Sequence, residues 1–88
     1  MRRTNINAVL KMVREYLNGE MDTLSFQLDF PYEIEQRYRK MVREDPDYAD
    51  MIYVYLVEQG TDLAYDMSDA AFKELIQKQY NNVMEGVY

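Results

Sequence analysis

Closely spaced carboxylates are the residues of this 88-residue chain with the clearest chemical potential. Asp45, Asp47 and Asp50 follow one another closely, and Ca²⁺ prefers several oxygen ligands from such acids. An EF-hand loop that began at Asp45 would place Asp50 where glycine is required and Leu56 where a bidentate glutamate is required. Pro46 directly after Asp45 suits the first turn of a helix capped by that aspartate. The sequence therefore favours a helix start over a metal site.

Catalytic chemistry is restricted by the absence of histidine and cysteine. Without them the chain has no Ser–His or Cys–His pair, no zinc site of the usual kinds and no Glu-x-x-His motif for a di-metal bundle. Glu33 and Glu35 are two positions apart, so their side chains diverge on a helix and cannot form an acid–base pair. We therefore expect a protein that is not an enzyme and that needs no cofactor.

Residues 44–72, called the acidic segment below, contain eight acids and no lysine or arginine. Four tyrosines are interleaved with these acids. A surface of one charge sign attracts oppositely charged partners and speeds their association, and tyrosine is enriched in protein interfaces. The segment therefore predicts a binding surface for a basic protein. The expected partner-binding residues are Asp45, Asp47, Asp50, Tyr53, Glu58, Asp62, Tyr65 and Asp66.

All ten basic residues lie outside the acidic segment, and eight of them form the set Arg2, Arg3, Lys11, Arg14, Arg37, Arg39, Lys40 and Arg43. A nucleic-acid-binding domain usually carries a concentrated basic stripe, whereas this chain has a net charge of −6 and a pI near 4.5. We therefore expect no direct binding of nucleic acid. Pairing of these cations with the acidic segment, within one chain or between chains, is the favoured interpretation.

Length and composition predict one folded domain over residues 1–88. Apolar residues make up 48% of the chain, which is too many for a disordered protein. No apolar run is long enough to span a membrane, and no apolar stretch of a secretory signal follows the N-terminal charges. We expect a cytoplasmic protein without membrane contact, and the lack of cysteine fits a reducing compartment.

The elements that must position the candidate residues are predicted to be helices. Ile6, Val9, Leu10, Val13 and Leu17 recur at helical spacing. Thr4 or Asn5 is expected to cap this first helix, and Asn18-Gly19 to end it.

Residues 22–30 carry two conflicting patterns. Leu24, Phe26, Leu28 and Phe30 alternate with polar residues as in a strand, but no other segment alternates and could pair with them. We expect a short helix that is bounded by Pro31, and a strand is the alternative interpretation. A second apolar stripe follows and ends near Glu44; its members are Ile34, Tyr38, Met41 and Val42.

Two further helices are expected in the second half of the chain. The first begins with Asp45 as its cap and Pro46 at its first position, and Gly60 either ends or bends it. Residues 61–67 are either a loop or a further turn. Ser68 caps the last helix, whose core stripe is expected to be Phe72, Leu75, Ile76, Val83 and Met84. The fold class is a small all-α antiparallel bundle of three to four helices.

Three stretches of the chain resemble bacterial immunity proteins, which neutralise colicin-type and contact-dependent toxins. Residues 13–20 (VREYLNGE) and 68–76 (SDAAFKELI) are similar to the first and last helices of the colicin D-type and related families. Asp50-Met51-Ile52-Tyr53 is similar to part of the toxin-binding helix of nuclease-colicin immunity proteins. Val54 replaces the second tyrosine of that motif, so the resemblance transfers a binding role to Asp50 and Tyr53 only.

The resemblance implies that the chain binds a basic toxin domain, such as a nuclease, through its acidic face. Such an inhibitor gains from being small, acidic and fast to associate. The alternative is a helical module that joins a larger complex or associates with a second copy, its positive first helix docking on the acidic segment of a neighbour. The sequence leaves open the identity of the partner and whether the protein forms a homodimer.

Overall fold

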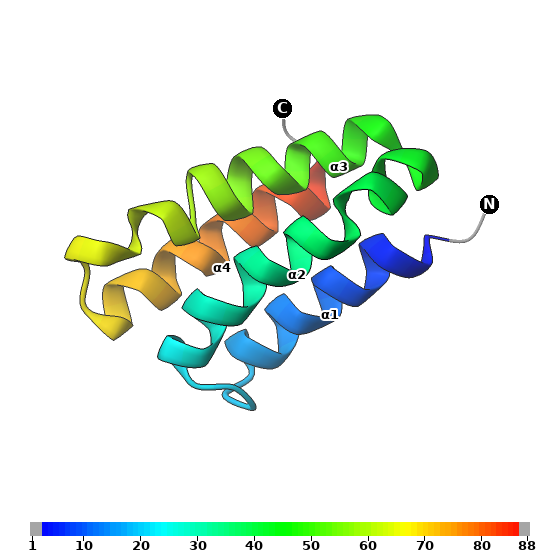
Figure 1. Cartoon of the computed structure of the whole chain (residues 1–88). Helices are drawn as coiled ribbons and strands as arrows, with labels where there is room; N and C mark the ends of the chain where they lie inside the picture. The colour runs from blue at the N-terminus through cyan, green and yellow to red at the C-terminus, as the bar shows by residue number, and fades with distance from the viewer. Residues whose placement is uncertain (1–2, 87–88) are drawn as a thin grey trace.

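Four α-helices form the bundle in the computed structural model, which describes residues 3–86 (Figure 1). No β-strand occurs among these residues. The helices α1, α2 and α3 are followed by a π-helical turn η1, a 3-10 turn η2 and a last helix α4. Their bounds are Thr4–Leu17, Thr23–Glu44, Pro46–Ile52, Tyr53–Glu58, Thr61–Asp66 and Asp69–Glu85. The expected small all-α bundle is confirmed, with four helices.

The packing of these elements follows an antiparallel path. Helix α1 packs against α2 and α4, α2 packs against α3, and α4 packs against η1. Figure 1 shows the segment from α3 to η2 running back along α2, so that η2 lies at the opposite end of the bundle from the start of α3. None of the helices in residues 3–86 combines the length and apolar character that crossing a bilayer requires.

The N-terminus of α1 is capped in a way that the sequence did not predict. Arg3 occupies the cap position and its side chain makes no capping bond, so the expected cap by Thr4 or Asn5 is wrong. The carboxylate of Glu44, at the end of α2, accepts the backbone N–H groups of Asn5 and Ile6 at 2.9 Å each. A carboxylate at this place satisfies unpaired N–H donors and favours the positive end of the helix dipole.

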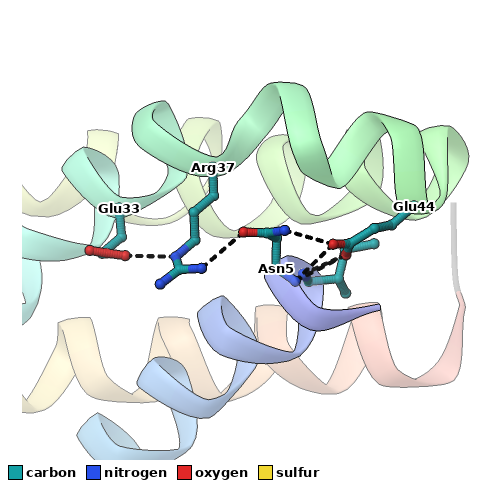
Figure 2. A network of polar contacts seen from close by, with 5 residues as sticks. Asn5, Glu33, Arg37 and Glu44 are labelled. Carbon is teal, nitrogen blue, oxygen red and sulfur yellow. Dashed lines mark hydrogen bonds and ion pairs between the residues drawn. The ribbon is translucent and has the colours of Figure 1, made fainter. Parts of the chain in front are cut away.

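Figure 2 shows how this contact continues along α2. The side-chain amide of Asn5 donates to Glu44 at 2.8 Å and accepts from Arg37 at 2.9 Å. Arg37 in turn pairs with Glu33 one helical turn earlier, also at 2.9 Å. The network fixes the start of α1 to the second half of α2. At the other end of α1, Gly19 adopts a φ of 83°, which supports the expected stop at Asn18-Gly19.

Helix α2 passes through Pro31 without ending. Asp22 caps it by accepting from the N–H of Ser25 at 2.7 Å, so the expected helix over residues 22–30 is present. The expected boundary at Pro31 is wrong, because one helix of 22 residues continues to Glu44. Pro31 removes one backbone N–H donor within α2, a cost that the helix bears without ending.

The segment from α3 to η2 begins as predicted and then departs from regular geometry. Asp45 accepts from the N–H of Tyr48 at 3.1 Å, and Pro46 occupies the first turn of α3. After Ile52 the helix widens into η1, where the N–H of Gln59 donates to the carbonyl of Val54. The run ends at Glu58. Glycine is required at position 60, because a Cβ there would lie 2.7 Å from the carbonyl carbon of Leu56. Residues 61–66 then form η2.

Aromatic side chains join three of the helices in the core. Tyr16 of α1 stacks on Phe26 of α2 with ring centroids 4.4 Å apart, and Phe26 stacks on Phe30 at 4.9 Å. Phe72 of α4 approaches Tyr16 at 5.9 Å. Tyr16 is 2% exposed and its hydroxyl is 3.0 Å from that of Thr23. Tyr16 lies outside the apolar stripe predicted for α1, although it is among the largest buried side chains.

Helix α4 starts where the sequence places it, since Ser68 accepts from the N–H of Ala71 at 3.1 Å. Phe72, Ile76 and Val83 are buried as expected. Met84 is 50% exposed, so its assignment to the core is wrong, and the buried Gln79 was missed. The amide of Gln79 donates to the carbonyl of Gln59 at 3.1 Å. This bond explains how a polar side chain is accommodated there.

Candidate protein-binding surface

A groove of about 850 Å³ lies between α2 and the segment formed by η1 and η2. Its α2 side extends from Pro31 to Arg43, and its other side comes from Tyr53, Val57 and Asp62. The remaining lining residues are Ile34, Glu35, Tyr38, Arg39 and Val42. Apolar and aromatic side chains with a few charged groups around them are typical of a surface that binds a protein segment.

Two tyrosines from different elements meet in the groove. Tyr38 of α2 and Tyr53 at the start of η1 pack edge to face, with ring centroids 5.6 Å apart and an interplanar angle of 64°. Tyr53 keeps 38% of its surface exposed. Because Tyr38 supports one side of the Tyr53 ring, that ring loses little conformational freedom when a partner covers its free side. Wide π-helical turns such as η1 often occur at functional sites.

Carboxylates of the acidic segment surround this pair. Burial raises the pKa of the Tyr38 hydroxyl, and the negative charges of Asp50 and Glu58 raise it further, together with the hydroxyl of Tyr53. Asp50, Tyr53 and Glu58, which the sequence predicted as partner-binding residues, are therefore close to one position on α2. Asp62 lines the same groove from η2. Four of the eight predicted residues thus gather around Tyr38 and the groove.

Asp45 and Asp47 lie at the start of α3, away from η2 (Figure 1). Asp45 is half-buried and forms an ion pair with Arg3 at 3.1 Å, in addition to its capping bond. The guanidinium of Arg3 also lies 4.2 Å from the ring centre of Tyr48. The carboxylate of Asp45 therefore has structural contacts within the chain, whereas Asp47 is exposed in the first turn of α3.

Tyr65 and Asp66 lie at the other end, in the last residues of η2. Tyr65 is 89% exposed, the highest value among the exposed large apolar and aromatic side chains of residues 3–86. Asp66 is exposed beside it. The eight predicted residues consequently follow one edge of the bundle from α3 to η2 and do not form one compact cluster.

Basic residues also line the groove, which the sequence analysis did not predict. Arg39 and Arg43 are one helical turn apart on α2. Neither forms an ion pair within residues 3–86. The signal in the sequence was the spacing of Tyr38, Arg39, Val42 and Arg43 on one side of a helix. It was obscured because Tyr38 and Val42 were assigned to the core, whereas Val42 is 37% exposed.

Cations of the first helix, by contrast, have contacts inside the chain. Arg3 pairs with Asp45, and Arg14 donates to the hydroxyl of Tyr80 at 3.1 Å. Lys11 is exposed, and Arg2 lies outside the described residues. Within residues 3–86, no three carboxylates lie close enough together to hold a metal ion.

No family model, no curated protein and no solved structure matches the chain. The site must therefore be interpreted from its own side chains.

Proposed function

We propose that this protein is a non-catalytic inhibitor that binds a basic protein domain, of the kind found in nuclease-type bacterial toxins. The binding surface is the exposed edge formed by α3, η1 and η2. The observation that carries the proposal is the exposure of Tyr53 and Tyr65 among acids, on a segment that has no lysine or arginine.

Charge and aromatic groups have different roles in this proposal. Asp47, Glu58, Asp62 and Asp66 are exposed, so they act mainly through long-range attraction and raise the association rate. Tyr53 is already ordered by Tyr38. When it is covered by a partner it supplies buried aromatic area and slows dissociation. The resemblance to immunity proteins at Asp50 and Tyr53 supports the same placement.

The test begins with recovery of the partner. The tagged chain is purified from its native host at low salt and at high salt, and the co-eluting proteins are identified. We expect a basic domain with nuclease activity, bound less at high salt because surface charges are screened. The purified domain is then titrated with the wild-type chain and with variants, while its cleavage of nucleic acid is measured.

The variants separate the two roles. Tyr53→Ala is expected to raise the dissociation rate about tenfold or more, and Asp62→Asn to lower the association rate a few-fold and to weaken its salt dependence. Glu74→Gln is the matched control, because it removes one exposed negative charge from α4, outside the proposed surface. Recovery of a partner that is not basic would overturn the proposal. Unchanged inhibition by Tyr53→Ala and Asp62→Asn would show that the surface is wrongly placed.

A further inference from the structure

One side of α2 exposes apolar residues along most of its length. Leu24 and Leu28 are each 65% exposed and Tyr32 is 60% exposed. Val42 is 37% exposed further along the same helix. Scattered exposed apolar residues are normal, but a run of them on one helix side indicates an interaction surface. The core contacts of α2 are made mainly from its other side, through Phe26, Phe30, Ile34 and Met41, with Tyr38 packed partly against the core.

The exposed and half-buried residues on this side follow the spacing of helices that pair with other helices. Steps of four and three residues connect six positions, here called the α2 face: Leu24, Leu28, Pro31, Glu35, Tyr38 and Val42. Five of the six are apolar or aromatic. Alternating steps of three and four keep the side chains on one side of a helix and are the pattern of helix–helix seams. The α2 face is about 27 Å long at 1.5 Å per residue.

The α2 face is complementary to itself when two copies run antiparallel. Placing Leu24 opposite Val42 of the second copy also places Leu28 opposite Tyr38 and Pro31 opposite Glu35. A two-fold axis near the middle of α2 generates the same three contacts again, as a symmetric dimer requires. The groove beside Tyr38 and Val42 then receives Leu24 and Leu28 of the second copy.

The exposed charges of α2 favour this direction of pairing. Asp29 lies in the first half of the helix, and Arg39 and Arg43 lie in the second half. The antiparallel alignment places the half of α2 that carries Asp29 beside the half of the second copy that carries Arg39 and Arg43. A parallel alignment would place the two arginine-bearing halves side by side, which is unfavourable.

The geometry points to a homodimer formed by antiparallel packing of the α2 faces of two copies. This inference does not depend on the proposed basic partner. One α2 face is a small interface, so the dimer should exchange and depend on concentration. It differs from the assembly expected from the sequence, in which the first helix of one copy docks on the acidic segment of another.

The test measures mass against concentration and then the identity of the pairs. Sedimentation equilibrium should show the wild-type chain passing from monomer to dimer as its concentration rises. Leu28→Glu should raise the dimer dissociation constant at least about tenfold, because it places a charge in the apolar interface. Met84→Glu is the matched control on α4, because Met84 is an apolar residue that is 50% exposed outside the α2 face. The dimer dissociation constant of this variant should equal that of the wild type.

A charge exchange tests the direction of pairing. Arg39→Glu and Asp29→Lys should each weaken the homodimer, because each reduces the charge complementarity between the adjacent halves of the two α2 helices. An equimolar mixture of these two variants should form a heterodimer in more than the statistical half of pairs. Native mass spectrometry distinguishes the three species by mass. Both positions are exposed, and circular dichroism verifies that the variants are folded.

Three outcomes would overturn the inference. The first is a wild-type chain that stays monomeric at all concentrations. The second is a dimer that Leu28→Glu does not weaken. The third is a mixture of the charge variants without preference for the heterodimer. If the wild-type chain is monomeric and Leu28→Glu abolishes binding of the basic partner, the α2 face is the site of that partner and not of a second copy.

Discussion

The Glu44 carboxylate is a long-range helix cap whose effect depends on its charge. Burial alone would raise its pKa, but the N–H groups of Ile6 and Asn5, the Asn5 side chain and the charge of Arg3 together lower it below its ordinary value of 4.5. Because the folded-state pKa is lower than the unfolded one, the unfolded chain binds more protons as the pH falls. The stabilisation is therefore complete above the ordinary pKa and is lost as the pH falls through the folded-state value.

Glu44→Gln should accordingly lower the free energy of unfolding by about 1 kcal/mol at neutral pH, which is the usual effect of losing a helix cap. The difference from the wild type should shrink as the solution is made acidic enough to protonate Glu44. Urea unfolding followed by circular dichroism at neutral and acidic pH checks both statements. Glu74→Gln, at an exposed position of α4, should leave stability nearly unchanged at every pH. A constant difference for Glu44→Gln across this range would contradict the role of its charge.

Helix α2 shows how one pattern can mislead at the scale of an element. Its first half alternates apolar and polar residues as a strand would, yet only alternate apolar residues face the core. Phe26 and Phe30 are fully buried, one helical turn apart, whereas Leu24 and Leu28 are 65% exposed. The spacing of apolar residues cannot distinguish a helix from a strand when the helix has apolar residues on two sides. The caps of α3 and α4 were easier to predict, because Asp45-Pro46 and Ser68-Asp69 act through neighbouring residues.

The two sides of α2 should respond differently to truncation. Phe26→Ala should lower the free energy of unfolding by about 3–5 kcal/mol, because it removes a fully buried ring that contacts Tyr16, Phe30 and Phe72. Leu24→Ala should change it by less than about 0.5 kcal/mol. Chemical unfolding at a protein concentration that keeps the chain monomeric checks both values. Equal losses at the two positions would mean that this segment does not pack as a helix with Phe26 inward.

At the scale of the whole molecule, the charge balance opposes folding. The net charge is −6, and ion pairs such as Arg3–Asp45 and Arg37–Glu33 offset only part of the repulsion. Salt screens interactions between exposed charges. The unfolding temperature of the monomer should therefore rise when sodium chloride is added. Differential scanning calorimetry of dilute protein at low and moderate salt checks this, and a fall in unfolding temperature would show that specific ion pairs outweigh the general repulsion.

The composition of the candidate surface was easier to predict than its arrangement. The acidic segment and the exposure of Tyr53 and Tyr65 follow from residues that lie outside the apolar stripes. The groove could not be predicted in this way, because it forms only where Tyr38 and Arg39 of α2 lie beside the π-helical turn η1. No local sequence pattern predicts that turn. Nor does any local pattern show that the carboxylate of Asp45 forms an ion pair with Arg3.

The contact between Glu44 and the start of α1 also constrains how the chain folds. The N–H groups of Asn5 and Ile6 find their acceptor almost forty residues later in the sequence. Helix α1 is synthesised first, but the N–H groups at its N-terminus have no cap until α2 has been completed and has docked. Hydrogen exchange at these two amides therefore reports on the docking of α2 as well as on the local stability of α1.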